Sequence, residues 1–344
     1  MTVAYCYDPL YLEHAEAEHP ERPERLSAVL RLLEGQGMLA RLQRVVAVPA
    51  SPAQLARVHA PAYIAQVERM ARRGGGYLDA DTYIGPRSYE AACLAAGGLL
   101  GVMAAVLRGE AESGFALVRP PGHHALADRG MGFCLFNNVA IAAKAAQQEH
   151  GLRRVLIVDW DVHHGNGTQD AFYTDGSVLF FSTHEYPHYP GTGHWRERGA
   201  GAGEGLIVNV PFPAGVGDEG YLRALDEVLA PLARRFGPEL ILVSAGYDAH
   251  WLDPLAGMQV TVRGFWALAR RVKALADALC HGRVVCTLEG GYHLEALAHS
   301  VLATLWALMG EPGEPPDPFG APAFAPRGAD DVLTQVKRVH GLAV

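Results

Sequence analysis

The sequence predicts an α/β protein in which helices cover both faces of a mostly parallel sheet. Short apolar runs alternate along the chain with longer stretches of helical pattern, as expected when crossover helices connect parallel strands. Several of these runs are apolar throughout, which is typical of strands buried on both faces. The expected strands are residues 3–6, 45–48, 115–118, 155–159, 178–182, 206–210, 240–244 and 284–288.

The helices expected between these strands have recognisable ends. Pro23 opens the first helix and Gly35 closes it, which fits the preference for proline at helix starts and glycine at helix ends. Glycines also follow three of the later helices. The expected helices are residues 23–35, 91–107, 137–150, 218–236, 262–280 and 294–309.

Composition limits the classes of function. With 344 residues, 49% of them hydrophobic, the chain can bury one large core, so we expect a single domain over residues 1–344. A Pro-rich surface segment, residues 311–328, is expected to lead into a short final helix. The net charge of -8 argues against a nucleic-acid partner, because phosphate binding needs clustered Lys and Arg.

The remaining compositional signals concern membranes and cysteines. The apolar stretch 91–107 comes closest to a membrane span, but its small residues favour a buried helix, and no membrane partner is expected. Five scattered cysteines without a CxxC pair indicate neither a cysteine metal site nor a disulfide framework. A reducing, cytoplasmic location is therefore expected.

Polar side chains follow four of the predicted strands at the point where each strand ends. His123 and His124 follow the run 115–118, and Asp159 begins a polar stretch after the run 155–158. Asp248 follows the run 240–243, and Tyr292 follows the run 284–288. Ligands of parallel sheets bind outside the carboxyl ends of the strands, so these side chains are expected to share one rim.

The spacing of Asp159, Asp161 and His163 places all three side chains on one side of an extended chain. A carboxylate and an imidazole both suit zinc, and a third ligand from another strand end would leave one position open, as catalytic zinc requires. Asp248 is the best candidate for that ligand. The alternative for an isolated Asp-x-His pair is a capping Asp and a hydrogen-bonded core His. The convergence of four strand ends favours a metal.

At these residues the sequence resembles the histone deacetylase family, in particular its class II-like and bacterial amidohydrolase branch, which is related to the acetylpolyamine amidohydrolases. The matching motifs occur in the order of the family and span roughly residues 8 to 310. They are His19-Pro-Glu-Arg-Pro-Glu-Arg-Leu26, Arg119-Pro-Pro-Gly-His-His-Ala125, Gly132-Phe-Cys-Leu-Phe-Asn-Asn138, Asp159–Gly167, Pro190-Gly-Thr-Gly193, Ser244–Asp248 and Glu289-Gly-Gly-Tyr292.

The resemblance implies a three-layer arginase/deacetylase-like fold with an eight-stranded sheet and a zinc-dependent deacylase activity. One Zn²⁺ per chain would bind Asp161, His163 and Asp248. His123, paired with Asp159, and His124, paired with Asn166, would form the acid–base pair, and Tyr292 would donate to the substrate carbonyl. The substrate tunnel would be formed by Gly132, Phe133, Tyr189, Leu255, Gly290 and Gly291.

The family also carries monovalent cation sites, so a structural K⁺ or Na⁺ is implied. The first would use Asp159, Asp161, His163, Ser182 and Thr183, and the second Phe172, Asp175 and Val178. Arg25 aligns with an arginine that lines an inner cavity in the family. The other histidines, His188 among them, are expected to be surface or packed residues, and Glu289 is expected to brace the Gly-Gly turn.

The implied substrate is an acylated lysine of a protein or an acetylated polyamine. Leu255 occupies the position where a polyamine-selective branch carries a glutamate, and the segment between Gly76 and Pro86 lacks a long insertion. Both features favour acyl-lysine over an acetylpolyamine amidohydrolase activity. A homo-oligomer is compatible with the sequence.

Three other functions agree less well with the sequence. A two-manganese ureohydrolase on the same fold would need a carboxylate two positions after the metal-binding His, where this chain has Gly165. A Rossmann dehydrogenase is disfavoured because its third glycine position is Asp170. A catalytically silent acyl-binding module would be expected to have lost the tyrosine, a ligand or a tunnel histidine, and all are present.

Overall fold

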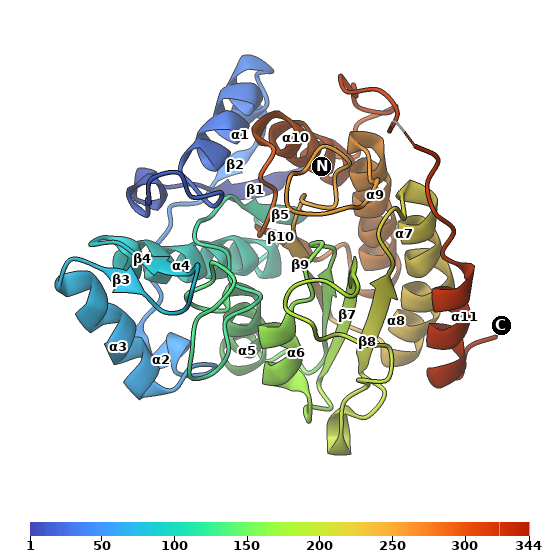
Figure 1. Ribbon diagram of the computed structural model, residues 1–344, viewed down its shortest axis with the longest axis horizontal. Helices are drawn as coiled ribbons and strands as arrows, with labels where there is room; N and C mark the ends of the chain where they lie inside the picture. Colours follow the sequence, from blue (N-terminus) through green and yellow to red (C-terminus); the bar gives the residue numbers. More distant parts are fainter. Residues whose placement is uncertain (323, 344) are drawn as a thin grey trace.

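Eight parallel strands form one sheet through the middle of the molecule (Figure 1). The computed structural model describes residues 1–322 and 324–343. The strand order is β2-β1-β5-β10-β9-β6-β7-β8, and every pair is parallel. The strands are β1 (Val3–Cys6), β2 (Gln43–Arg44), β5 (Ser113–Ala116), β6 (Val155–Asp159), β7 (Val178–Glu185), β8 (Ile207–Phe212), β9 (Leu240–Ala245) and β10 (Val284–Leu288). A separate antiparallel pair joins β3 (Gly76–Tyr77) to β4 (Tyr83–Ile84).

Helices cover both faces of the sheet, with α4 and α5 on one face and α1, α9 and α10 on the other (Figure 1). The helices are α1 (Glu24–Gly35), α2 (Pro52–Leu55), α3 (Pro61–Arg72), α4 (Ser88–Leu107), α5 (Asn138–His150), α6 (Asn166–Phe172), α7 (Asp218–Ala224), α8 (Ala230–Phe236), α9 (Val262–Leu279), α10 (Leu294–Leu308) and α11 (Asp330–Val339). Short 3₁₀ turns are η1 (Pro9–Glu13), η2 (Leu39–Arg41) and η3 (Gly201–Gly203), and a π turn, η4 (Leu225–Leu229), joins α7 to α8.

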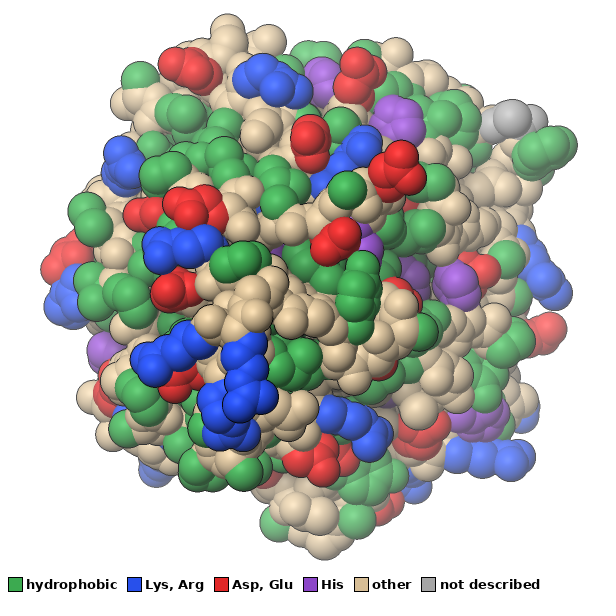
Figure 2. Space-filling view, turned by 60° about the vertical axis from the view of Figure 1, so that its left-hand side comes forward, with side chains coloured by type: hydrophobic (Ala, Val, Ile, Leu, Met, Phe, Trp, Pro, Cys, Tyr) green, Lys and Arg blue, Asp and Glu red, His purple; other side chains and the backbone are tan. Residues whose placement is uncertain are grey.

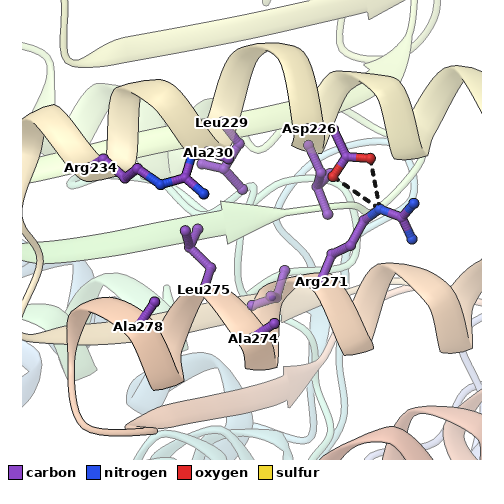
Figure 3. Close-up of a pocket in the computed structure, with 10 residues that line it drawn as sticks. Asp226, Leu229, Ala230, Arg234, Arg271, Ala274, Leu275 and Ala278 are labelled. Atoms are coloured by element: carbon purple, nitrogen blue, oxygen red, sulfur yellow. Dashed lines mark hydrogen bonds and ion pairs between the residues drawn. The ribbon is translucent and has the colours of Figure 1, made fainter.

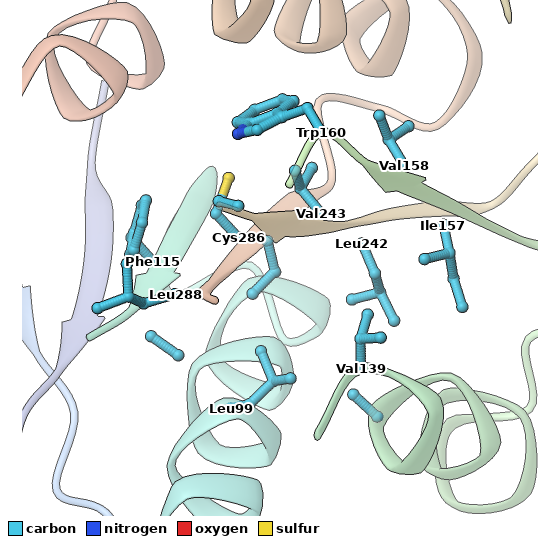
Figure 4. Close-up of a cluster of buried hydrophobic side chains, with 14 of the residues drawn as sticks. Leu99, Phe115, Val139, Ile157, Val158, Trp160, Leu242, Val243, Cys286 and Leu288 are labelled. Carbon is cyan, nitrogen blue, oxygen red and sulfur yellow. The ribbon is translucent and has the colours of Figure 1, made fainter. Parts of the chain in front are cut away.

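The central strands are buried on both sides, as their continuous apolar sequences predict. In β9, Leu242 points toward Val139 of α5, whereas the next residue, Val243, points to the opposite face near Trp160 (Figure 4). All four side chains are at most 1% exposed. The sheet is therefore a rigid scaffold whose strand ends, rather than its faces, are free to carry function.

Most predicted elements are confirmed, several of them to the residue. The runs 3–6, 155–159 and 284–288 are strands β1, β6 and β10, and the predicted helix 218–236 spans α7, η4 and α8. The predicted strand 115–118 begins two residues earlier, as β5. The helix α3, the short helices α2 and α6 and the β3–β4 pair were not predicted.

The predicted strand at 45–48 is wrong. Strand β2 pairs with β1 only at Gln43 and Arg44, and Val46 and Val48 are 76% and 68% exposed. After Arg44 the backbone crosses α4 so closely that a Cβ atom at Gly97 would collide with the carbonyl oxygen of Val48. Close packing on a glycine therefore replaces strand pairing here, and the Val-rich composition is overridden by tertiary context.

Of two further predicted segments, the apolar helix lies in the core and the Pro-rich segment lies at the surface. Helix α4 is long and apolar enough to cross a membrane, but 72% of its apolar window is buried inside the molecule, as expected of a core helix. The Pro-rich segment 311–328 is mostly exposed in its described part, residue 323 lying outside the described residues, and α11 follows it. On the face shown in Figure 2, acidic and basic side chains lie interspersed among hydrophobic ones.

Candidate active site

The predicted functional residues converge because four of their strands are neighbours. β5, β10, β9 and β6 are consecutive in the sheet, and their carboxyl ends carry His123 and His124, Tyr292, Asp248 and the Asp159–His163 stretch, respectively. Residues far apart in sequence thus meet at one edge of the sheet, where ligands of parallel sheets bind.

Asp161, His163 and Asp248 form a buried cluster that suits a metal ion. Their ligand atoms all lie within 4.8 Å of one another. Nδ1 of His163 is 3.1 Å from Oδ1 of Asp161 and 3.2 Å from Oδ2 of Asp248. Burial alone would lower the pKa of His163, but hydrogen bonds to the two carboxylates raise it to about 10. Burial and the charge of Asp161 raise the pKa of Asp248 to about 7, so a cation bound between the two carboxylates would relieve their repulsion.

Backbone groups hold the two carboxylates in place. The Gly290 N–H donates to Oδ2 of Asp161 at 2.8 Å, and the Val162 N–H donates to Oδ1 of Asp248 at 2.8 Å. A Cβ atom at Gly246 would collide with the Asp161 carboxylate, and one at Gly290 would collide with that of Asp248. Glycine at these two positions allows the main chain to form a cradle around the cluster.

Gly165, which follows His163 and His164, bears on how many metal ions the site can hold. A Cβ atom at Gly165 would collide with Oδ2 of Asp159. No larger side chain fits at Gly165 without displacing Asp159, so the bridging carboxylate of a two-metal centre has no room. The carboxylate that a two-metal centre would need at this position is therefore absent.

His123 and His124 are adjacent in sequence but have opposite electrostatic surroundings. Nδ1 of His123 lies 3.0 Å from Oδ2 of Asp159, and Nδ1 of His124 lies 2.7 Å from Oδ1 of Asn166. Burial would lower the pKa of His123, but the Asp159 and Asp161 carboxylates raise it to about 10. Burial, together with the charges of His123 and His163, holds the pKa of His124 well below its usual value.

It follows that His123 is charged and His124 is neutral near pH 7. Because Oδ1 of Asn166 can only accept a hydrogen bond, Nδ1 of His124 carries the proton when this bond forms. Nε2 of His124 is then left as a hydrogen-bond acceptor.

A cavity of about 210 Å³ opens above the cluster. Rings on its wall pack edge to face, with centroids 5.8 Å apart for Phe133 and Tyr292 and 5.2 Å apart for His124 and Tyr189. Its lining consists of Asp81, His124, Gly132, Phe133, His163, His188, Tyr189, Leu255 and Tyr292. The predicted tunnel residues Gly290 and Gly291 do not line this cavity; Gly290 belongs to the carboxylate cradle.

His188 was expected to be a bystander, but it lines the cavity. Its ring centroid is 5.2 Å from that of His163, and its Nε2 is 2.9 Å from the carbonyl oxygen of Leu255. The neighbouring His164 faces away from the cavity instead, and its Nδ1 contacts Oγ1 of Thr192 at 2.8 Å. No pattern around His188 distinguishes it in the sequence, since its role depends on the fold of the loop before Pro190.

Asp253 is a second residue that sequence reasoning missed. Its carboxylate accepts the backbone N–H of Tyr292 at 2.7 Å and that of His293 at 3.2 Å, and also that of Leu255 at 3.0 Å. It is only 6% exposed. Asp253 therefore links the loop of Tyr292 to the loop of Leu255. The bond to Leu255, two residues on, is an Asx turn, and the Asp-Pro pair was the one available signal.

Glu289 has a different role from the one expected. Oε2 of Glu289 accepts the backbone N–H groups of Gly122 at 2.7 Å and His123 at 3.2 Å, and Oε1 accepts the Ser244 hydroxyl at 3.0 Å. The carboxylate thus braces the loop of the histidine pair. Arg25 supports the Gly-Gly turn instead, because its Nε donates to the Gly291 carbonyl at 2.7 Å. The Arg25 guanidinium also lies 5.0 Å from the ring centroid of Tyr292.

The residues predicted for monovalent cations fall into two places. Asp159 is paired with Ser182 in the β6–β7 register, and the Thr183 hydroxyl lies 3.5 Å from the Asp159 carbonyl oxygen. Both contacts lie next to the loop that carries Asp161 and His163, which we call the metal loop. Phe172, Asp175 and Val178 lie between the end of α6 and the start of β7. The Asp175 carboxylate accepts from Nζ of Lys144 at 2.6 Å.

Known proteins share this fold and sequence. A profile of the Histone deacetylase domain matches residues 19–308. "Histone deacetylase 10, chloroplastic" of Oryza sativa subsp. japonica is 45% identical over 90% of this chain and 74% of its own length. "Polyamine deacetylase HDAC10" of Homo sapiens is 46% identical over 86% of this chain and 45% of its own length. The solved structure of the HDA15 HD domain superposes with a TM-score of 0.91 at 38% identity, covering 98% of this chain and 94% of that domain.

These likenesses cover nearly the whole chain, and the three-layer fold is that of the arginase/deacetylase-like proteins. The family uses a metal, and its buried donor set is present here. The chain therefore belongs to the histone deacetylase family and is a deacetylase, a hydrolase that acts on acetyl amides.

Proposed function

We propose that this protein is a single-zinc deacylase whose metal is held by Asp161, His163 and Asp248. The observation that carries the proposal is the buried cluster of two carboxylates and one imidazole within 4.8 Å. Two carboxylate oxygens and an imidazole nitrogen match the three protein ligands of a catalytic zinc site. The glycine cradle and the collision at Gly165 support one ion rather than two.

The residues around the cluster suit the hydrolysis of an amide. Zinc in such a site activates water for attack and polarises the amide carbonyl. Neutral His124, with Nε2 free to accept, would take the proton of the attacking water and pass it to the leaving amine. Charged His123, held by Asp159, would stabilise the negative charge that develops on the substrate. The Tyr292 hydroxyl would donate to the substrate oxygen.

We propose an acylated lysine side chain as the substrate, with an acetylated polyamine as the second candidate. The narrow aromatic lining by Phe133 and Tyr189 fits the slender aliphatic stem that both substrates share. Leu255 places an apolar group, not a charge, in the lining. In favour of a polyamine, Asp81 also lines the cavity, and the relative named polyamine deacetylase is 46% identical.

The proposal also includes two monovalent cations, a single domain and a cellular location. One structural K⁺ or Na⁺ would bind beneath the metal loop at Asp159, Asp161, His163, Ser182 and Thr183. The second would bind main-chain oxygens of Phe172, Asp175 and Val178, because the Asp175 side chain is engaged by Lys144. We propose one catalytic domain over residues 1–344. The five cysteines, all free and buried, fit a reducing cytoplasm.

The replacement His163→Ala tests the metal assignment, with His150→Ala, an exposed histidine on α5, as the matched control. Bound zinc is measured by elemental analysis, and activity by the release of a fluorescent amine from an acetyl-lysine anilide. We expect one zinc per chain in the parent and the control. The His163→Ala protein should lose zinc and activity while keeping its circular dichroism spectrum. Two metals in the active protein, or full activity without His163, would defeat the assignment.

A further inference from the structure

A surface pocket of about 420 Å³ lies at the amino ends of β6, β7 and β8, the opposite end of the sheet from the active site. Five separate segments line it: the residue before β6, the start of β7 with the turn before it, the loop before β8, the end of α8 and the residue after α11. Figure 1 shows α8 and α11 beside β8 at this edge of the molecule. We call this hollow the basic pocket, after its cationic or basic side chains Arg154, Arg198, Arg235 and His340.

The charges of the basic pocket are not balanced by acids. The only carboxylate in its lining is that of Glu204, which lies 3.4 Å from the Arg198 guanidinium. Among residues 1–322 and 324–343, no carboxylate lies within 4.0 Å of the Arg154 or Arg235 guanidinium. The nearby Glu239 carboxylate instead accepts the backbone N–H groups of Arg153 and Arg154. This excess of positive charge occurs in a chain of net charge -8.

A neighbouring groove contains an arginine that the protein balances with its own carboxylate. The groove lies between α8 and α9, and there Arg271 is bonded to both carboxylate oxygens of Asp226, at 3.0 and 2.9 Å (Figure 3). Like charges brought together without a counter-charge repel one another. The basic pocket gathers three guanidinium groups around one carboxylate, so an anionic ligand would relieve their mutual repulsion.

The buried histidine of the pocket supports this interpretation. His340 is only 6% exposed, and its Nε2 atom has no hydrogen-bond partner among the described residues. A buried polar nitrogen without a partner carries a desolvation cost, which a hydrogen bond to a ligand would relieve. His340 is also one of the residues that line the pocket.

The pocket is also preorganised. Nε of Arg154 donates to the Gly237 carbonyl at 2.7 Å, which fixes that guanidinium at the wall. The Gly205 N–H donates to the Arg198 carbonyl at 2.7 Å, which anchors the Arg198 backbone to the loop before β8. The lining includes Leu179, Leu206, Leu232 and Phe236, so an apolar floor accompanies the charges.

We propose that the basic pocket binds a phosphate-bearing small molecule. Guanidinium groups match the geometry of phosphate oxygens and bind them by paired, charge-assisted hydrogen bonds. A volume of about 420 Å³ exceeds what a phosphate ion fills and falls in the range of small-molecule sites. The phosphate would lie among the three guanidinium groups, and the apolar floor would contact an attached organic body.

A plainer explanation accounts for part of the pattern only. Cations near the carboxyl end of a helix are stabilised by the helix dipole, and Arg235 lies in the last turn of α8. Arg154 and Arg198 are not in helices. The dipole also gives no partner to Nε2 of His340. The two explanations differ in whether an anion binds with a defined stoichiometry.

Isothermal titration calorimetry on the full chain tests the proposal, with inorganic phosphate and adenosine monophosphate as probes at low, fixed salt. We expect saturable one-to-one binding of at least one probe, with a Kd of about 1 mM or below. Tighter binding of the nucleotide would indicate that the floor contacts an organic body, and equal binding would indicate recognition of the phosphate group alone. Failure of both probes to saturate below about 10 mM would overturn the proposal.

Two variants and a matched control assign the binding to this pocket. Arg198→Gln and Arg235→Gln should each weaken binding at least about tenfold, because each removes charge-assisted hydrogen bonds. Arg234→Gln, the adjacent residue of α8 whose side chain lies in the neighbouring groove (Figure 3), should stay within twofold. Equal weakening by Arg234→Gln, or no weakening by the two pocket variants, would overturn the proposal. If one pocket variant fails to fold, the other decides.

Deacetylase activity separates this proposal from the proposed function. The basic pocket and the active site lie at opposite ends of the same strands, so both pocket variants should keep activity within twofold of the parent. Activity retained with binding lost supports the pocket whatever the zinc assay shows.

Discussion

Strand β6 has opposite chemistry at its two ends. Its carboxyl end leads from Asp159 into the loop that carries Asp161 and His163, where acids and imidazoles neutralise one another through short bonds. Its amino end follows Arg154, which lies in a pocket with an excess of guanidinium groups. At the first end the protein supplies both signs of charge itself. At the second end three guanidinium groups share a single carboxylate, that of Glu204, and the proposed ligand would supply further negative charge.

The two ends of β6 differ in whether the protein itself pairs their charged groups, as a catalytic site and a binding site would. A catalytic centre needs each group in a fixed protonation state, and mutual pairing achieves this for His123 and His124. A binding pocket gains affinity from leaving its charges unsatisfied until the ligand arrives.

The largest effect is expected for Tyr292→Phe, which keeps the ring and removes the hydroxyl. The hydroxyl should donate most strongly when the substrate oxygen carries charge, which occurs only in the transition state. We expect kcat to fall at least about a hundredfold, or roughly 2.7 kcal/mol, with little change in KM or zinc content. Steady-state kinetics on an acetyl-lysine peptide measures both constants. A kcat within threefold of the parent would remove Tyr292 from the mechanism and favour a silent binding module.

A smaller effect is expected for Asp253→Asn. The amide is isosteric but presents a donor to one of the N–H groups that the carboxylate now accepts, those of Tyr292 and Leu255 among them. Small displacements of a catalytic group are costly, so kcat should fall about tenfold. Asp226→Asn, in the exposed pair with Arg271, is the matched control and should leave kcat unchanged.

The double variant distinguishes positioning from loss of stability. If Asp253 acts through Tyr292, adding Asp253→Asn to Tyr292→Phe should lower kcat no further than Tyr292→Phe does. Additive losses would show that Asp253 supports the site by another route.

From the sequence we could predict that side chains at the carboxyl ends of the strands meet at one rim, but not that a basic pocket forms at the amino ends, and the reasons are physical. At the carboxyl ends of β5, β6, β9 and β10, functional residues directly follow continuous apolar runs, so local pattern and the topology of parallel sheets suffice to bring them together. Those same runs made β6 and β10 predictable to the residue.

The misses depend on tertiary contacts. Residues 45–48 have strand composition, but their backbone packs on Gly97, and nothing local encodes that contact. The positions of His188 and Asp253 follow from how two loops fold against each other. The basic pocket is lined by the start of β7, two helix ends and two further segments before β6 and β8, so no window of the sequence contains more than one of its arginines.

A specificity change is expected at the mouth of the cavity from Leu255→Glu. A carboxylate there can pair with the distal ammonium of N8-acetylspermidine, and an exposed pair is worth up to about 1 kcal/mol. The ratio of kcat/KM for the polyamine over an acetyl-lysine peptide should therefore rise about fivefold. Leu255→Gln, similar in length but uncharged, is the matched control. A ratio that moves equally in both variants would assign the effect to size rather than charge, and no movement would place Leu255 away from the substrate.

The smallest effect concerns the response of the two ends to acid. Burial, with Arg198 and Arg235 adding to it, lowers the pKa of His340 to about 4, whereas in the unfolded chain it should be near 6.5. Between these values the unfolded chain binds a proton that the folded chain does not, so the free energy of unfolding falls as the pH drops through 6.5. His123 behaves oppositely, because its pKa is raised to about 10 and its contribution is fully present below pH 6.5.

In His340→Gln the destabilising contribution of His340 is absent, while His123 and the other buried histidines are unchanged. The parent should therefore lose about 1 kcal/mol or less more than the variant between pH 7.5 and 6.0, measured by urea unfolding, with the exposed His150→Gln matching the parent. If the basic pocket takes an anion, adding phosphate should reduce this difference, because the anion favours the charged imidazole. Equal pH slopes in parent and variant would mean that burial and the neighbouring arginines do not hold His340 neutral, and the contrast between the two ends of β6 would lose this electrostatic support.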